Sequence, residues 1–341
     1  MNWIMPAETA PQDRVWMAFP VEGYTLGDDP ESAEEARRAW ATVANTTVEF
    51  EPVTMVVDPS ARAHATRLLS SEVDVVEAPL DDFWMRDFGP TFVLGENGLA
   101  AVDWTFNAWG MAAGAVWAKD AEIARFVAAQ ADVPVISSVM VNEGGGIHVD
   151  GEGTVLVTET VQLDPHRNPF ADKARVEAEL ARTIGATHVI WLPRGLERDY
   201  SNAGTRGHVD ILATIPSPGT LLVHQQRDPS HPDFEITKML KEFLATTHDA
   251  KGRSWDIIDL PAPSVLKDDD GFVDYSYVNH LVVNGGVIAC GFRDEAADAE
   301  ARDILATAYP GRRVVTVDAV PIFSRGGGIH CITQQQPSVP T

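Results

Sequence analysis

The sequence GGGIH occurs twice, at residues 144–148 and 326–330, and the second copy continues into Cys331. Three consecutive glycines let the backbone approach another group closely, because they carry no Cβ atom. Glu143 precedes the first copy, so the same kind of loop presents a carboxylate in one place and a thiol in the other. A loop motif that recurs with different reactive neighbours is typical of a repeated structural unit whose loops carry the chemistry.

Outward from these loops, a pattern of apolar strand, polar or glycine-rich loop, strand pair and amphipathic helix recurs along the chain. We expect strand pairs at 91–95 with 99–105, 147–149 with 154–158, 208–215 with 220–225, and 277–284 with 287–292, and a last strand at 329–333. The expected helices are 60–70, 118–131, 170–184, 234–247 and 294–308. The pattern predicts about five α/β units in a single domain, 1–341, closed around a central site. A doubly wound sheet is the competing fold, but the strand pairs break its strict alternation of strand and helix.

The composition excludes several classes of protein. The formal net charge of -24 opposes nucleic-acid binding, which needs basic patches, and favours a cationic ligand. No run of 18 apolar residues predicts a membrane span, and the first sixteen residues lack the features of a secretory signal. Because only two cysteines are present, we expect a reducing, cytoplasmic environment. The phosphate-binding glycine motifs and the GxSxG nucleophile motif are absent from the sequence.

Cys331 is a candidate nucleophile. It ends a glycine-rich loop beside His330, and polar residues follow it in the sequence TQQQ at 333–336. A cysteine in such a loop is compatible with covalent catalysis. A lone cysteine is also compatible with a small buried hydrophobe, and we interpret Cys290 in that way.

The tripeptide HVD also occurs twice, as His148 to Asp150 and as His208 to Asp210. Alternation along a strand would place His208 and Asp210 on one face. Two such pairs are compatible with a metal site. However, the closely spaced additional ligands of zinc signatures are missing, so the sequence favours no metal.

Asp87 lies in the sequence DDFWMRDFGP at 81–90. One interpretation is a loop ion pair with Arg86, which would contribute little. The other is that Asp87 anchors a planar cation against Trp84, because paired carboxylates match the forked N–H donors of a guanidinium. Glu143 is a further acid in a glycine loop.

These segments also occur together, in this order and over nearly the whole chain, in one known family. The motifs are MPAE (5–8), WMRDFGP (84–90), FNAWG (106–110), EGGGIHVDGEGT (143–154), WLPRG (191–195), GHVD (207–210), SYVN (276–279) and GGGIHCITQQQP (326–337). Jointly they resemble the agmatine deiminases of the bacterial-type peptidylarginine deiminase family. The resemblance implies the pentein fold, an α/β propeller of five pseudo-symmetric ββαβ-like modules around a central site.

The resemblance also implies an activity, the hydrolysis of a small cationic guanidine to a urea and ammonia without a metal or organic cofactor. For agmatine this reaction belongs to the formation of putrescine. Members are commonly homo-oligomers, and we expect a dimer. Carried onto this sequence, the family's nucleophile corresponds to Cys331 and its general acid and base to His208. Asp87 and Asp210 correspond to the guanidinium-binding carboxylates, and Glu143 to the acid that orients the histidine.

The same resemblance places pocket walls at Trp84 and Trp109 and a supporting polar group at Asn279. The chain departs from the family pattern before the histidine, where an acid and an asparagine are usual and this sequence has Gly204 and Arg206. An acid there would receive the distal ammonium of agmatine, whereas an arginine would receive a carboxylate. We therefore count Arg206 among the candidate substrate-binding residues, in a loop, 194–207, that is a candidate lid.

Four functions remain open at the level of sequence. The first is an agmatine deiminase, and the second is a deiminase of another small guanidine with a distal carboxylate or of peptidyl-arginine. The third is an amidinotransferase, because relatives with this fold pass the amidino group to an amine. The fourth is a non-catalytic binding module. Gly328, which stands where many family members have asparagine, alters the loop before Cys331 in each case.

Overall fold

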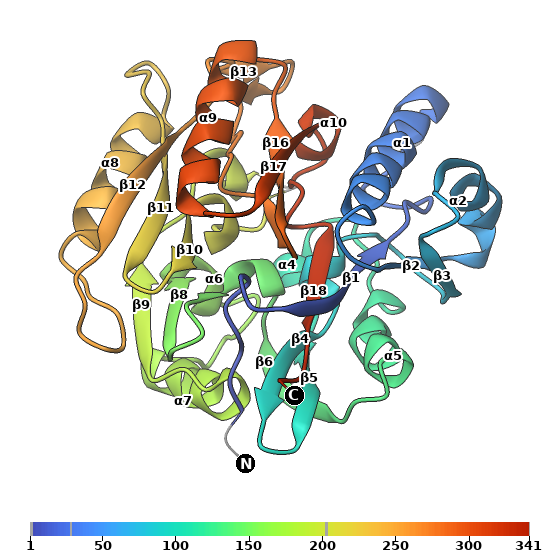
Figure 1. Ribbon diagram of the computed structural model, residues 1–341, viewed down its shortest axis with the longest axis horizontal. Helices are drawn as coiled ribbons and strands as arrows, with labels where there is room; N and C mark the ends of the chain where they lie inside the picture. The colour runs from blue at the N-terminus through green and yellow to red at the C-terminus, as the bar shows by residue number, and fades with distance from the viewer. Residues whose placement is uncertain (1–2, 28, 202–203, 341) are drawn as a thin grey trace.

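The computed structural model describes residues 3–27, 29–201 and 204–340, and its strands surround a centre on which the loops converge (Figure 1). Four of its sheets have three strands each, and in each the first two strands are antiparallel and the last two parallel. They comprise β4 (Thr91–Gly95), β5 (Gly98–Thr105) and β6 (Val135–Val141); β7 (His148–Val149), β8 (Thr154–Thr158) and β9 (His188–Leu192); β10 (Ala213–Ser217), β11 (Thr220–Gln225) and β12 (Asp256–Pro261); and β15 (Leu281–Val283), β16 (Gly286–Gly291) and β17 (Arg313–Asp318).

A fifth sheet repeats this order with strands from opposite ends of the sequence. It comprises β18 (Thr333–Pro337), β1 (Gln12–Ala18), β2 (Val53–Val57) and β3 (Asp74–Glu77). β18 pairs antiparallel with β1, and β1 pairs parallel with β2. The pairing of β18 with β1 therefore completes the ring of five units.

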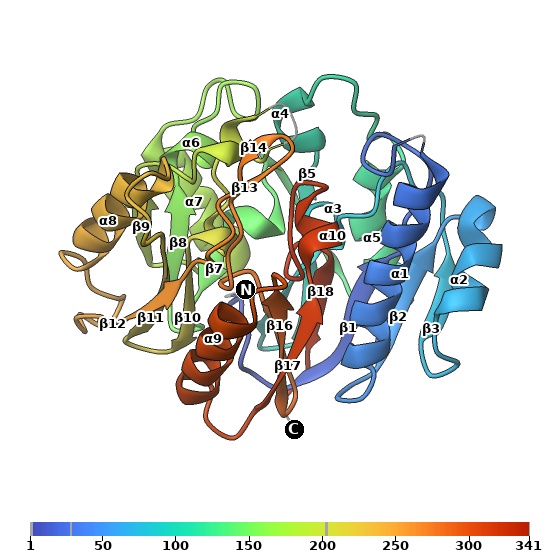
Figure 2. The same ribbon diagram turned by 90° about the horizontal axis from the view of Figure 1, so that it is seen from above.

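Helices cover the outer faces of the sheets (Figures 1 and 2). The longer ones are α1 (Pro30–Thr47), α2 (Arg62–Leu68), α5 (Ile123–Gln130), α7 (Lys173–Ile184), α8 (Asp233–Leu244) and α9 (Glu295–Ala308). Helix α7 illustrates why they form: Asp172 caps its first turn, Gly185 ends it in the left-handed conformation, and Val176, Leu180 and Ile184 form its buried stripe. None of the described helices is long and apolar enough to cross a membrane.

Short elements complete the description. They are the helices α3 (Met85–Phe88), α4 (Ala108–Met111), α6 (Glu159–Gln162) and α10 (Val320–Phe323), the 3₁₀ turns η1 (Pro59–Ala61), η2 (Asp120–Glu122), η3 (Gly144–Gly146), η4 (Arg198–Tyr200) and η5 (Val209–Ile211), and the hairpin β13 (Lys267–Asp268) with β14 (Gly271–Phe272). Four of them, α3, α4, η3 and η5, include or adjoin residues of the candidate site. The short turns of these four elements, and not regular strands, therefore position the side chains of the candidate site.

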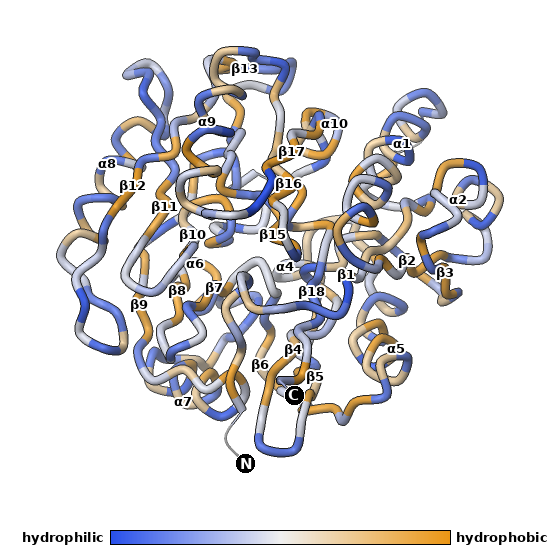
Figure 3. The backbone as a smooth tube through the Cα atoms, viewed as in Figure 1, coloured by the Kyte–Doolittle hydropathy of each residue, from blue (hydrophilic) through white to orange (hydrophobic). Residues whose placement is uncertain are grey.

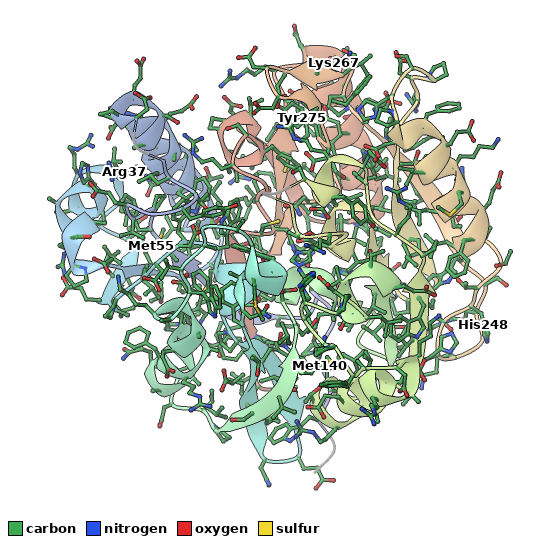
Figure 4. The ribbon with its side chains drawn as sticks, turned by 180° about the vertical axis from the view of Figure 1, so that it is seen from behind. Arg37, Met55, Met140, His248, Lys267 and Tyr275 are labelled. Carbon is green, nitrogen blue, oxygen red and sulfur yellow. The ribbon has the colours of Figure 1, made fainter. Side chains whose placement is uncertain are left out.

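The core lies between the sheets and the helices. Strands such as β2 and β8 are buried along their whole length, because a helix covers one face and the centre of the molecule covers the other. Hydrophobic segments accordingly lie in the strands and hydrophilic ones in the outer loops (Figure 3). In Figure 4, Met55 of β2 is fully buried near helix α1, and Lys267 lies on the hairpin at the rim.

The expected alternation of strands and helices is confirmed, but three predicted strands begin too early, and the last of them, 329–333, shares only Thr333 with the observed strand. β10 begins at Ala213, β15 at Leu281 and β18 at Thr333, whereas strands were predicted from 208, 277 and 329. The residues before each strand form turns, and their side chains are buried on every side. In sequence, an apolar run of this kind cannot be distinguished from a buried strand. His208 and Asp210 are therefore positioned by the 3₁₀ turn η5 and not by strand alternation.

Candidate active site

The candidate residues lie just before the first strand of each of the five sheets. Asp87 precedes β4, Glu143 precedes β7, His208 and Asp210 precede β10, Asn279 precedes β15, and Cys331 precedes β18. Since these strands begin near the centre, the five turns that precede them, which are distant in sequence, meet there. The recurring loop motif of the sequence thus corresponds to a structural position that recurs once in each unit.

A cavity of about 580 Å³ opens onto this meeting point. Cys331, Asp87, Trp84 and Trp109 line it, as do residues of the segment 198–205 and Asp274. The side chains of Glu143, His208, Asp210 and Asn279 lie directly behind this lining and are buried. Turns from all five sheets supply these groups, and Cys331 among them is only 5% exposed.

The thiol of Cys331 contacts an amide and a carboxylate. Asn279 Nδ2 donates to Cys331 Sγ at 3.2 Å, and Sγ lies 3.4 Å from Asp210 Oδ2. Burial, Asp210 and Asp87 raise the pKa of Cys331 well above its ordinary value. The sulfur is therefore a thiol in the free protein, and a cation beside it would favour the thiolate.

The imidazole of His208 lies between two carboxylates. Its Nε2 is 3.3 Å from Glu143 Oε2, and its Nδ1 is 3.7 Å from Asp87 Oδ1. Burial opposes the charged ring, but Asp87 and Glu143 outweigh it and raise the pKa of His208 to about 9. His208 is thus an imidazolium near neutral pH, and its Nδ1 has no hydrogen-bond partner among the described residues.

Glu143 is held by an arginine that the sequence did not indicate. Arg167 Nε donates to both oxygens of Glu143 at 3.0 and 3.1 Å, and Arg167 Nη1 donates to Asp164 Oδ2 at 2.9 Å. Burial alone would raise the pKa of Glu143, but Arg167 and His208 lower it to about 2. Glu143 therefore remains anionic and fixes the ring of His208.

Asp87 and Asp210 form the expected pair of carboxylates. Asp87 accepts hydrogen bonds from Trp109 Nε1 at 2.8 Å and from the amide of Gly145 at 3.3 Å. Asp210 Oδ2 accepts from His330 Nδ1 at 2.9 Å, and Asp210 Oδ1 has no partner among the described residues. Burial raises the pKa of Asp87 to about 6. A planar cation beside the pair would stabilise both anions.

The alternative ion pair between Arg86 and Asp87 is not what the structure has. Arg86 Nε donates to the carbonyl of His330 at 3.2 Å, and Nη1 lies 3.8 Å from Glu8 Oε1. The arginine thus extends away from the cavity, because Asp87 is already bound by Trp109 and Gly145. Asp87 keeps its side toward the cavity free for a ligand.

Arg206 lies apart from the other candidates. Its Nε is 3.7 Å from Asp164 Oδ2, its side chain is 44% exposed, and it is not among the described residues that line the cavity. The segment around it forms one wall, through Arg198, Asp199 and Gly204. Asp199 accepts from the amides of residues 205, 207 and 208 and thereby ties this wall to His208.

We expect that replacing Gly145 by alanine disables the site. A Cβ atom at this position would lie 2.5 Å from His208 Nδ1 and 3.0 Å from both Asp210 Oδ2 and Asp87 Oδ1. The three groups would have to separate, and displacements of this size cost about a hundredfold in rate. Steady-state kinetics on Gly145→Ala, with circular dichroism to verify folding, measures this effect. Wild-type kcat/KM in a folded variant would contradict the site as described.

Comparisons with known proteins identify the family of the chain. A family model described as Porphyromonas-type peptidyl-arginine deiminase matches residues 4–337. A Streptomyces coelicolor protein provisionally named agmatine deiminase is 55% identical, covering 99% of this chain and 99% of its own. The agmatine deiminase of Pseudomonas putida is 39% identical, covering 98% of this chain and 95% of its own. The solved structure of the Enterococcus faecalis agmatine deiminase has a TM-score of 0.91 at 32% identity, covering 99% of this chain and 96% of that one.

Proposed function

Because the chain belongs to the Porphyromonas-type peptidyl-arginine deiminase family and has the pentein fold, we propose that it is an agmatine deiminase. The enzyme is a hydrolase that acts on C–N bonds. The proposed reaction converts agmatine and water into N-carbamoylputrescine and ammonia. The observation that carries the proposal is the convergence of a thiol, an imidazolium and two carboxylates on one cavity.

Substrate binding prepares the nucleophile. Asp87 and Asp210 hold the guanidinium by paired hydrogen bonds and fix its plane against Cys331 Sγ. The arriving cation stabilises the thiolate, so the thiol proton is lost to solvent as substrate enters. The sulfur then attacks the guanidinium carbon and forms a tetrahedral adduct.

His208 serves in both halves of the reaction. In the first half its imidazolium donates a proton to the departing nitrogen, the C–N bond breaks, and ammonia leaves. The remaining S-alkylthiouronium is attacked by water, and neutral His208 takes the proton of that water. The C–S bond then breaks, which gives the urea and returns Cys331 to its starting state. Glu143 keeps His208 in place throughout.

The distal part of the cavity favours a positive group. The carboxylate of Asp274 lines the cavity and has no hydrogen bond to another side chain among the described residues. Burial and the neighbouring Asp199 raise its pKa to about 7. The arginines of this wall are already engaged, because Arg198 donates to Asp268 at 2.8 Å and Arg325 donates to Ser32 at 2.7 Å. A distal ammonium therefore fits better than a distal carboxylate.

Replacing Asp274 by asparagine is expected to raise the KM for agmatine by about tenfold to a hundredfold, since a hydrogen bond to a charged group contributes about 1.5–3 kcal/mol. Butylguanidine, which lacks the distal ammonium, should show no such change. Asp270→Asn is the matched control, because the side chain of Asp270 is 87% exposed and contributes less. Equal losses for agmatine and butylguanidine would assign Asp274 a role other than ammonium binding.

The activity itself is tested by detecting ureido products and ammonia from a panel of guanidines. The panel comprises agmatine, free arginine, guanidino acids and an arginyl peptide, each with and without an added amine acceptor. We expect turnover of agmatine to exceed that of the others and to release ammonia without an acceptor. A preference for a guanidino acid, a requirement for an amine, or no turnover at all would each replace the proposal with one of the other three functions.

We further propose that residues 1–341 form one catalytic domain that acts as a homodimer in the cytoplasm. The pairing of β18 with β1 and the contribution of all five units to one site support a single domain. Sedimentation equilibrium of the purified protein measures the oligomeric state, and a monomer at micromolar concentration would contradict the dimer.

A further inference from the structure

Two buried side chains, His330 and Glu8, continue a series of hydrogen bonds behind the guanidinium-binding carboxylate of Asp210. Glu8 Oε1 lies 2.8 Å from His330 Nε2, and His330 Nδ1 lies 2.9 Å from Asp210 Oδ2. The residues are 7%, 3% and 3% exposed, so water does not compete for these bonds. His330 directly precedes the nucleophile, and Glu8 comes from the segment before β1.

The geometry favours a His330 that carries two N–H groups, because an anionic carboxylate lies on each side of its ring. A neutral imidazole has one N–H donor and one acceptor nitrogen, so it cannot donate to carboxylates on both sides. Both ring nitrogens face a carboxylate oxygen at hydrogen-bond distance, which describes an imidazolium between two anions. Burial and Arg86 oppose this charge, yet the two carboxylates raise the pKa of His330 above its ordinary value.

The same cluster could be mistaken for a metal site, since Glu8, His148 and His330 bring their ligand atoms close together. However, His148 Nε2 already accepts the amide proton of Ile215 at 2.9 Å, so the proton of neutral His148 is on Nδ1, facing Glu8. Both nitrogens of His330 are donors. A metal ion would find no lone pair on either imidazole.

His330 also connects Asp210 to the turn of the nucleophile. Its amide donates to Asn279 Oδ1 at 3.0 Å, and its carbonyl accepts from Arg86 Nε at 3.2 Å. Asn279 and Arg86 therefore fix the backbone of the residue before Cys331, while Glu8 and Asp210 fix its ring. Any loss of the ring contact would let Asp210 move relative to the sulfur.

We propose that Glu8 and His330 are positioning residues of the reaction, which keep Asp210 anionic and oriented beside Cys331 for the substrate guanidinium. The inference rests on the proposed guanidine hydrolysis. Glu8 acts through His330, because it contacts neither the described residues that line the cavity nor Asp210. Its negative charge keeps the proton on His330, and His330 in turn lowers the pKa of Asp210 despite its burial.

The titratable and charged groups that face His330 are all buried. They are Glu8, Arg86, His148, Asp210, His280 and Cys331. Burial lowers the pKa values of His148 and His280 to about 4, so both are neutral near pH 7. Glu8 and Asp210 are then the anions that hold the proton on His330, and Arg86 opposes it. Removal of the charge of Glu8 leaves only Asp210 to favour the protonated ring of His330, while Arg86 still opposes it.

The test is Glu8→Gln, which keeps the size of the side chain and an acceptor oxygen but removes the charge. We expect the KM for agmatine to rise by about ten- to fiftyfold, a smaller fall in kcat, and a decline of kcat/KM that begins at least one pH unit lower than in the wild type. Glu8→Asp restores the charge and should recover part of the pH range. His148→Gln, which alters the same cluster without contacting Asp210, should leave the pH profile unchanged.

A measurement independent of activity accompanies the kinetics. In protein labelled with ¹⁵N-histidine, both ring nitrogens of His330, assigned by their loss in His330→Gln, should remain protonated at pH values where an ordinary histidine has lost its proton. A His330 ring with one unprotonated nitrogen at pH 7 would overturn the proposal. So would a Glu8→Gln variant with the wild-type KM and pH profile. A Glu8→Gln variant that loses kcat and stability without a shift of its pH profile would also overturn it, because that result indicates a purely structural role. If the wild type fails to turn over agmatine, the proposed function fails alone, because the ring protonation is read without substrate.

Discussion

Replacing Cys331 by alanine is expected to reduce the formation of ureido product at least a thousandfold, the scale on which loss of a covalent nucleophile acts. Among the described residues that line the cavity, Cys331 is the only cysteine, so no second thiol can replace it. Binding should persist, since both carboxylates remain. Steady-state assays of ammonia and of the ureido product measure catalysis, and calorimetry measures the binding of agmatine, so that the loss of catalysis is separated from any loss of binding.

The matched control for this prediction is Cys290→Ala. Cys290 donates to the carbonyl of Asn279 at 3.0 Å, is buried, and has a pKa raised by burial to about 12. It therefore has no thiolate to offer, and we expect its replacement to leave kcat within a fewfold of wild type. Turnover of Cys331→Ala above one hundredth of the wild-type rate would remove the covalent mechanism.

The second large effect is expected for His208→Asn, with a loss of about a thousandfold in kcat, within the range for a residue that transfers protons. Asparagine occupies similar space but neither donates a proton to ammonia nor accepts one from water. The first turnover should be slowed as well as the second half-reaction. Rapid-quench kinetics, in which the ammonia and the covalent thiouronium intermediate are both quantified, distinguishes the two half-reactions. A wild-type burst of ammonia in His208→Asn would contradict a role for His208 in the first half-reaction.

The pH dependence of the wild type follows from the same residue. The pKa of His208 is raised to about 9 in the folded protein, so the proton-donating form is present below that pH and is lost above it. We expect kcat/KM to decline as the pH rises through about 9. The same sign applies to the free energy of unfolding. The raised pKa of His208 stabilises the folded protein fully at pH values below the pKa of the unfolded state, and this stabilisation is lost as the pH rises through the pKa of the folded state.

The sequence was informative where the residue type itself restricts the backbone or the chemistry. Glycine-rich loops and periodic apolar residues predicted five α/β units, and the order of sheets confirms this. The clustering of Cys331, His208 and the acids could be anticipated, because each lies in the same position of its unit. The starts of β10, β15 and β18 could not, since buried turns and buried strands have the same composition.

Residues that act through a partner were missed for a different reason. Arg167 and Glu8 belong to segments without a strand or a glycine loop, and each contacts its partner from a distant position in the sequence. A single arginine or glutamate carries no local pattern that identifies what it touches. Only the folded arrangement shows that these charges neutralise Glu143 and His330.

The pairing of β18 with β1 makes catalysis depend on the closure of the ring. β18 follows the other described strands in the sequence, and the nucleophile lies two residues ahead of it. Without this pairing β1 would present an open strand edge, and Cys331 would not be held beside Asp210 and Asn279. A variant that loses the pairing is therefore expected to lose catalysis even where the other four sheets remain folded.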